Sequence, residues 1–197
     1  MNRLWRLLPY GAMGLLAAQL ALMFASWLLG AANPVSGIRS LLSGEGLRWL
    51  LGRFADTMAS PLLVWLVVLA MAYGALCRSR LLHRPATYRE RRALMIALLL
   101  LALIVIVMLL LTVIPHAVLL SATGALWPSP FTASLLPVTA WAAIVISTAY
   151  GLVAGTFNDM ADVFDALTDG IGRAAPLFLL YILAMQLWQS VCFVFAL

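Results

Sequence analysis

Residues 93–114 are an almost unbroken run of apolar side chains, mostly leucine, isoleucine and valine, without a single charge. An α-helix needs about 20 apolar residues to cross the hydrocarbon core of a bilayer, and this run has that length. Inside lipid, a segment must satisfy its backbone hydrogen bonds internally, as a helix does. Pro115 follows and is expected to end or kink the helix. The run therefore predicts a transmembrane helix.

Four further stretches are apolar enough to behave in the same way. Hydrophobic residues make up 65% of the 197 residues and charged residues only 10%, whereas soluble domains are about 45–50% apolar. We predict an all-α integral membrane protein that forms a single membrane domain over residues 1–197. Its transmembrane helices are expected at residues 7–29, 61–76, 93–114, 135–156 and 176–195.

The first two spans have recognisable starts. Arg3 and Arg6 precede the first run and small residues follow it, so it also has marks of a secretory signal peptide. It is longer than the apolar core of an ordinary signal peptide, and we expect a retained span. The second span is expected to begin at Pro61, because proline suits the first turn of a helix and Ser60 can cap it.

The positive charge is concentrated between the second and third spans. All 12 basic residues are arginines, and the segment 77–92 holds Arg78, Arg80, Arg84, Arg89, Arg91 and Arg92. Loops rich in arginine stay in the cytoplasm, so we predict a cytoplasmic arginine loop, an inner N-terminus and an outer C-terminus. Cys77 and Cys192 then lie on opposite membrane faces and are not expected to form a disulfide. The arginines gather at span ends without interleaved aromatic residues, so no nucleic-acid partner is expected.

The segment 36–58 reads as an amphipathic element on the outer face. Ser36 can cap a short turn, and Ser43 a second helix with Glu45 in its first turn, where the helix dipole favours an acid. One face carries Leu47, Leu50, Leu51, Phe54 and Met58. The other face carries Glu45, Arg48, Gly52, Arg53 and Asp56, with Trp49 beside it. Such a helix is expected to lie in the membrane interface.

A second amphipathic helix is predicted at residues 158–171, between the last two spans. Its apolar face holds Met160, Val163, Phe164, Leu167 and Ile171. Its acidic face holds Asp159, Asp162, Asp165 and Asp169. We expect these aspartates to pair with the arginine loop on the same membrane side, since a metal ion needs more converging oxygens than one helix face supplies. The order of span, surface helix and span then occurs twice, as in the inverted repeats of secondary transporters.

Rows of small residues predict close helix packing. One row, in the fourth span, is Ala140, Ala143, Ser147, Gly151 and Gly155. Another, in the first span, is Ala17, Ala21 and Ala25. Small side chains let helix backbones approach closely in lipid, so these rows favour helix packing and dimer formation.

Several motifs carry a resemblance to known proteins. They are "IRSLLSGEGLRWLL" at residues 38–51, "SPF" at 129–131, "AYGLVAGTFNDMADVFDALTDGI" at 149–171 and "LFLLYILAMQL" at 177–187. The first resembles the segment after the first span of the p-aminobenzoyl-glutamate transporter (AbgT) family, and the others resemble later parts in that family's order. The resemblance includes the pair Tyr150–Gly151, the pair Asp162–Val163, and the alanine and glutamine at Ala184 and Gln186.

The resemblance implies a multi-pass protein of the bacterial inner (cytoplasmic) membrane that forms a homodimer or joins another membrane protein. The family's members are longer, ion-coupled dimeric transporters of aminobenzoyl-glutamate and related aromatic amides, with a pair of re-entrant hairpins that carry substrate. The arginine loop stands here where the first hairpin region is expected, so the sequence resembles a short form without the hairpins.

The predicted spans contain several polar side chains, but few of them indicate a catalytic or ligand-binding role. The polar residues are Gln19, Thr112, His116, Ser147, Thr148, Gln186, Gln189 and Ser190. In lipid such side chains commonly bond between helices, and His116 either anchors at the interface, as Trp127 is expected to do, or titrates near neutral pH. If the protein transports substrate, we expect Ser147, Tyr150, Gln186 and Gln189 to contact it. No catalytic residue, metal site or cofactor is expected, and the chain is not expected to be an enzyme.

Two functions remain open at this point. The first is a scaffold or accessory subunit that keeps the framework helices of the family without transporting alone. The second is a minimal homo-oligomeric transporter or exporter of p-aminobenzoyl-glutamate-like aromatic amides. Polar residues buried between helices favour the first, and polar residues around a hydrated cavity favour the second.

Overall fold

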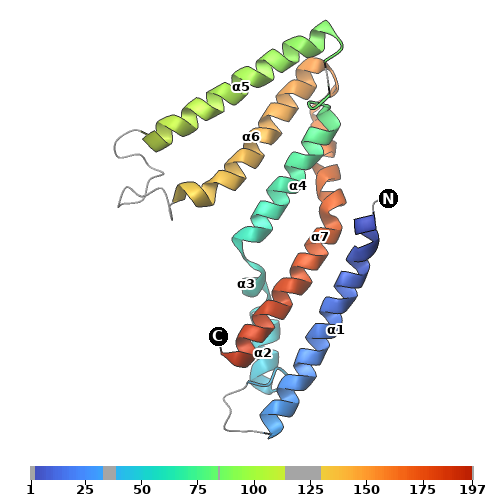
Figure 1. The fold of residues 1–197 in the computed structure, drawn as a ribbon, viewed down its shortest axis with the longest axis vertical. Helices are drawn as coiled ribbons and strands as arrows, with labels where there is room; N and C mark the ends of the chain where they lie inside the picture. The colour runs from blue at the N-terminus through green and yellow to red at the C-terminus, as the bar shows by residue number, and fades with distance from the viewer. Residues whose placement is uncertain (1–2, 33–38, 84, 114–129, 197) are drawn as a thin grey trace. The chain divides into compact units, whose positions relative to one another are not determined.

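The computed structural model describes residues 3–32, 39–83, 85–113 and 130–196 (Figure 1). Within these ranges the regular elements are all helices: α1 (Arg3–Ala32), α2 (Gly44–Gly52), α3 (Phe54–Met58), α4 (Pro61–Ser79), α5 (Tyr88–Val113), α6 (Pro130–Ala154) and α7 (Met160–Phe195). Five of them, α1 and α4 to α7, are long and apolar enough to cross a membrane. The predicted class, an all-α membrane protein with five spans, is confirmed. The expectations for Ser36, Pro115, His116 and Trp127 lie outside the described residues.

The chain divides into two compact units. Met1–Leu63 and Ala175–Leu197 form one, here called the terminal unit, and Val64–Ala174 forms the other, the central unit. Helices α4 and α7 each contribute to both.

In the terminal unit, α1 and the last turns of α7 run in the same direction. Gly11 lies near Leu180, and eight residues further on Gln19 Nε2 donates a 2.9 Å hydrogen bond to Ser190 Oγ. Both contacts advance together along the two helices, which makes the helices parallel. First and fifth spans of a five-span chain must cross the membrane in the same direction, so this packing agrees with the predicted number of spans.

The segment before α2 is pinned to the same two helices. Leu41 is completely buried against Phe193 and Val194, and its backbone N–H donates to Ser26 Oγ. The Arg39 N–H donates to the Val194 carbonyl at 3.1 Å. Hydrogen bonds between residues distant in sequence therefore fix the segment that leads into α2 against α1 and the C-terminal end of α7.

The predicted cap of α2 is confirmed, but the amphipathic helix is shorter than expected. Ser43 Oγ accepts the Gly46 N–H at 3.1 Å, as an N-cap does. Gly46 is needed there, because a Cβ would lie 2.6 Å from the Leu41 carbonyl oxygen. The helix ends at Gly52, and α3 starts after Arg53, so the predicted continuous helix is two short ones.

Helix α4 starts at Pro61 as predicted, yet Ser60 does not use its hydroxyl as a cap. Tyr181 Oη donates to the Met58 carbonyl at 3.0 Å and lies 2.6 Å from Ser60 Oγ. Since the tyrosine proton goes to Met58, the Ser60 hydroxyl is the donor to Tyr181. The Ser60 hydroxyl therefore bonds Tyr181 of α7 instead of capping the first turn of α4, as the sequence had predicted.

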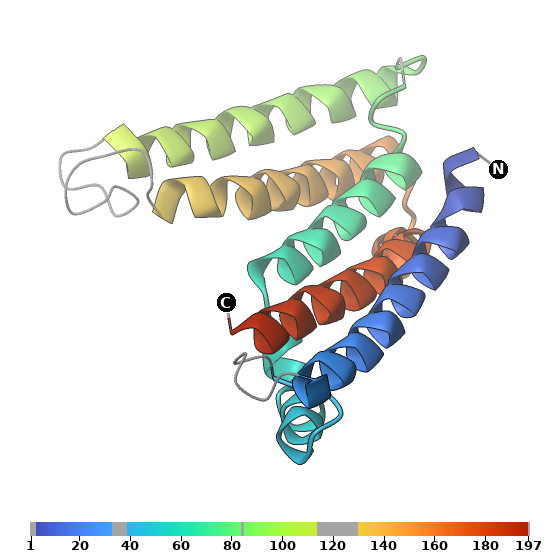
Figure 2. The ribbon, with the colours of Figure 1, turned by 60° about the horizontal axis from the view of Figure 1, so that its bottom comes forward.

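In the central unit, α5 and α6 pack side by side and antiparallel (Figures 1 and 2). Buried Ala93 and Ala97 of α5 meet Ile146 and Tyr150 of α6. Elsewhere in this unit, Ala72 of α4 packs with Ala140 and Ile144 of α6. Alanines on one side of each contact let the helices approach closely.

The predicted surface helix at 158–171 and the predicted span at 176–195 are one continuous helix, α7. Pro176 lies inside it rather than at its start. An interior proline removes one backbone hydrogen bond and does not by itself end a helix when packing holds both sides. The second half of the chain therefore lacks the separate surface helix that an inverted repeat requires.

Candidate functional site

Ser147 and Tyr150, two of the predicted substrate residues, are enclosed in the central unit. The Ser147 side chain is completely buried and donates to the Ala143 carbonyl of its own helix. Thr148, beside it, donates to the Ile144 carbonyl at 2.9 Å. Tyr150 is 3% exposed, within the cluster that joins α5 to α6. The hydroxyls of Ser147 and Thr148 thus bond within α6, and the Tyr150 side chain packs among apolar residues.

The small-residue row of α6 serves two purposes. Ala140 and Ala143 belong to the cluster with α4. Gly151 lies under the ring of Phe157, with no room for a side chain, and its carbonyl accepts the N–H groups of Thr156 and Phe157. Gly155 has a left-handed φ of +82°, which glycine adopts without strain. The two glycines thus shape the turn that ends α6.

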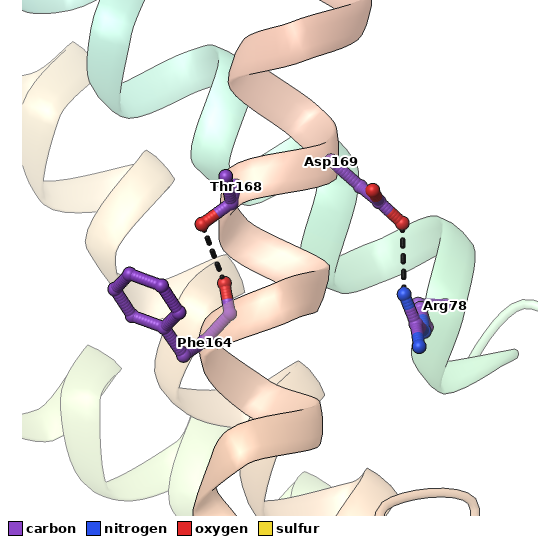
Figure 3. A network of polar contacts seen from close by, with 4 residues as sticks. All are labelled: Arg78, Phe164, Thr168 and Asp169. Atoms are coloured by element: carbon purple, nitrogen blue, oxygen red, sulfur yellow. Dashed lines mark hydrogen bonds and ion pairs between the residues drawn. The ribbon is translucent and has the colours of Figure 1, made fainter.

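Charged residues hold the ends of the central unit's helices. Arg78 of α4 pairs with Asp169 of α7 at 2.8 Å, and in Figure 3 this pair lies beside the bond from Thr168 to the Phe164 carbonyl. Arg89 Nε donates to the Val153 carbonyl at 2.8 Å. The predicted pairing between the aspartate face and the arginine loop is confirmed for Arg78 and Asp169.

Two other acids of this region, Glu90 and Asp162, cap helices. The Glu90 carboxylate accepts the N–H groups of Ala86 and Thr87. The Asp162 carboxylate accepts the N–H of Asn158 at 2.8 Å. Across the described ranges, no group of three or more histidine, cysteine or acidic side chains is arranged to hold a metal ion.

The predicted apolar face of α7 is covered only in part. Val163 and Leu167 are half-buried, and Leu167 packs against the cluster of Ala72, Ala140 and Ile144. Met160 and Phe164 are 73% and 68% exposed, whereas Ala166 and Gly170 are buried. A Cβ on Gly170 would lie 2.9 Å from the Gly74 Cα, so backbone contact covers a side of the helix that the apolar pattern did not indicate.

The terminal unit holds the other two predicted substrate residues, Gln186 and Gln189. Within the described ranges, the side-chain oxygens of Gln186 and Gln19 are buried and have no hydrogen-bond partner. Gln19 uses its amide nitrogen for Ser190. Ser40 Oγ, in the segment before α2, is a third buried oxygen without a partner among the described residues. The interior of this unit therefore contains unpaired polar atoms, in contrast to the satisfied hydroxyls of Ser147 and Thr148.

Gln189 lines a groove between the end of α7 and the segment from Arg39 to Trp49 of α2. The groove has a volume of about 340 Å³ and is lined by Arg39, Trp49, Gln189, Cys192, Phe193 and Ala196. The rings of Trp49 and Phe193 stack with centroids 4.6 Å apart. The Arg39 guanidinium lies 5.8 Å from the centre of the Phe193 ring. The sequence did not predict the contact between Arg39 and Phe193, because 154 positions separate the two residues (193 minus 39) and no local pattern links them.

Trp49 packs α2 against the end of α7, whereas the sequence pattern predicted that it lies beside the polar face. It is half-buried against Phe193. Most of the predicted apolar stripe points outward: Leu47, Leu51 and Phe54 are 42%, 77% and 47% exposed. Leu50 is half-buried, Met58 is buried, and Arg48 and Arg53 are exposed.

Five helices long and apolar enough to span a membrane, with charges at the helix ends, define a multi-pass helical membrane protein. Residues 77–193, more than half of the chain, match the AbgT putative transporter family. The chain belongs to this family, as the resemblance predicted. It is a family of transporters, which agrees with the expectation that the chain is not an enzyme. Searches of curated proteins and of solved structures gave no match.

Proposed function

We propose that this transporter-family protein acts as a membrane scaffold or accessory subunit. The observation that carries the proposal is the enclosure of Ser147 and Tyr150 in the central unit. A side chain that receives substrate must be accessible in at least one state and must exchange its hydrogen bonds with the ligand. Ser147 and Thr148 bond carbonyls of their own helix, and Tyr150 packs among apolar side chains.

The remaining contacts of the central unit also favour a framework. Gly74 and Gly170 bring α4 and α7 into backbone contact, and Arg89 ties the start of α5 to the end of α6. Interfaces between small residues hold helices in a fixed geometry because the backbones touch over several turns. Such a unit is suited to hold other membrane elements in place.

We further propose that the protein resides in the bacterial inner membrane and forms a homodimer through α1. The row Ala17, Ala21 and Ala25 is exposed along this helix, and nothing lies near Gly14 on the same helix. An uncovered row of small residues is the surface that a second transmembrane helix packs against in lipid. Another membrane protein of the same cell is the alternative occupant of this face.

Uptake into proteoliposomes tests the scaffold role. The purified protein is reconstituted alone, and uptake of labelled p-aminobenzoyl-glutamate is measured with imposed proton and sodium gradients. We expect no uptake beyond that of protein-free vesicles. Saturable, gradient-dependent uptake by the protein alone would overturn the proposal.

The unpaired oxygens of Gln19 and Gln186 favour a second candidate, a minimal homo-oligomeric transporter of p-aminobenzoyl-glutamate-like aromatic amides. Buried acceptors without partners are costly unless a ligand, a water or a partner supplies a donor. In this case the uptake described above is present, and Gln186→Leu abolishes it. A matched Gln186→Glu variant, which keeps acceptor oxygens, retains part of the uptake.

A further inference from the structure

The groove lined by Arg39, Trp49 and Gln189 has no part in the framework role. Arg39 is exposed, and its backbone is held by the bond to the Val194 carbonyl. Its guanidinium faces the Phe193 ring, and among the described residues no carboxylate lies within ion-pair distance of it. Within the part of the chain that the structure describes, the groove thus presents a cation without an ion-pair partner, on a backbone held by a hydrogen bond.

The lining has the donors that an oxyanion needs. A guanidinium presents several N–H groups in a planar fork and binds phosphate or carboxylate oxygens in pairs. Gln189, on the same wall, adds an amide group that can donate. The stacked rings of Trp49 and Phe193 also line the groove, whose exposed lining is mainly polar. This combination fits a ligand with an anionic head attached to a glycerol portion.

The surroundings indicate where that ligand comes from. Helix α2 exposes Leu47 and Leu51 along one side and Arg48 on another, as a helix at the membrane interface does. Helix α7, which supplies the opposite wall, is a span that ends at Phe195, next to the groove. Tryptophan is enriched at this depth of membrane proteins. The groove therefore lies at the level of lipid headgroups.

We propose that this groove binds the phosphodiester group of an anionic phospholipid. Arg39 contacts the phosphate oxygens, Gln189 donates to them, and the Trp49–Phe193 pair supports the glycerol and the first methylene groups. The exposed leucines of α2 contact the acyl chains. Arg48 adds positive charge on the same helix and favours anionic lipids over zwitterionic ones. The site is independent of the scaffold role proposed above.

Cys192 provides a reporter, because it lines the groove and is half-buried. In a Cys77→Ser background, the rate of maleimide labelling at Cys192 is measured in detergent with added phosphatidylglycerol, phosphatidylcholine or inorganic phosphate. Phosphatidylglycerol retained after delipidation is counted in parallel by native mass spectrometry. We expect phosphatidylglycerol to slow labelling several-fold and to be retained, whereas phosphatidylcholine and inorganic phosphate do neither.

The matched variants are Arg39→Gln and Arg53→Gln, which remove one exposed arginine each. We expect Arg39→Gln to lose both protection and lipid retention with an unchanged thermal midpoint, and Arg53→Gln to keep both. Equal protection in Arg39→Gln, equal loss in the two variants, or protection by inorganic phosphate as strong as that by the lipid would each overturn the proposal.

Discussion

Gly74 and Gly170 touch backbone to backbone in the central unit: a Cβ on Gly74 would lie 2.7 Å from the Gly170 Cα. Each glycine lies four residues from a buried alanine on its own helix, Ala70 on α4 and Ala166 on α7. This spacing repeats a small residue once per turn and keeps the two backbones close.

Gly170→Leu is expected to destabilise the central unit, because the side chain has no space and the helices must separate. Overpacking of this kind costs about 1–3 kcal/mol. The thermal midpoint in mild detergent measures the effect. Gly172→Leu is the matched control, since nothing lies near the Cβ position of Gly172. A midpoint for Gly170→Leu equal to that of the control would show that the contact does not contribute.

The Arg78–Asp169 ion pair is expected to contribute little to stability. The two side chains are 42% and 52% exposed, and exposed pairs are worth about 0.2–1 kcal/mol. A double-mutant cycle with Arg78→Gln and Asp169→Asn, followed by thermal unfolding, measures the coupling directly. A coupling well above that range would mean that the pair is shielded from water in the assembled protein.

The interfacial helix is expected to depend on its apolar side and not on its arginines. Leu50→Asp with Phe54→Asp removes a half-buried and an exposed apolar side chain and adds two charges where the helix meets lipid. Fully burying such side chains is worth about 1.5–3 kcal/mol each, so we expect loss of assembly and a lower thermal midpoint. Arg48→Gln with Arg53→Gln should fold and assemble normally. Wild-type behaviour of the aspartate pair would show that α2 and α3 are ordinary loop elements.

The fold was largely predictable because lipid imposes a simple rule on sequence. Each span is an apolar run, and the Ser43 cap with Glu45 in the first turn of α2 is a local pattern. The misses have a different origin. Trp49 packs inward because Phe193 lies opposite, and the Ser60 hydroxyl bonds Tyr181 across 121 positions. Single-sequence patterns contain no information on such distant partners.

The candidate site was less predictable than the fold for the same reason. The sequence predicted one set of substrate contacts, because all four residues are polar and lie in spans: Ser147, Tyr150, Gln186 and Gln189. In the structure the first two are enclosed in the central unit, and the last two belong to the terminal unit. Gln19 and Ser190 pair across 171 positions. The backbone contact between Gly74 and Gly170 involves no large side chain. It therefore produces no amphipathic pattern in the sequence from which it could be predicted.

The orientation rests on the arginine loop and is tested by labelling from outside. Single cysteines replace Gly44 and Thr87 in a protein that carries Cys77→Ser and Cys192→Ser. Both positions are exposed, so the membrane alone decides whether an impermeant maleimide reaches them in intact cells. We expect labelling at residue 44 and none at residue 87 until the membrane is permeabilised. The opposite pattern would reverse the predicted topology.

Accessibility of the span interior tests the scaffold account most directly. Ser147→Cys and Gln186→Cys, each made in the same cysteine-free background, are exposed to a small impermeant thiosulfonate in the assembled, membrane-embedded protein, with Thr87→Cys in permeabilised membranes as the reactive control. The account predicts no modification at residues 147 and 186 under conditions that modify the control completely. Rapid modification of either residue, slowed by p-aminobenzoyl-glutamate, would contradict it and establish a hydrated substrate path.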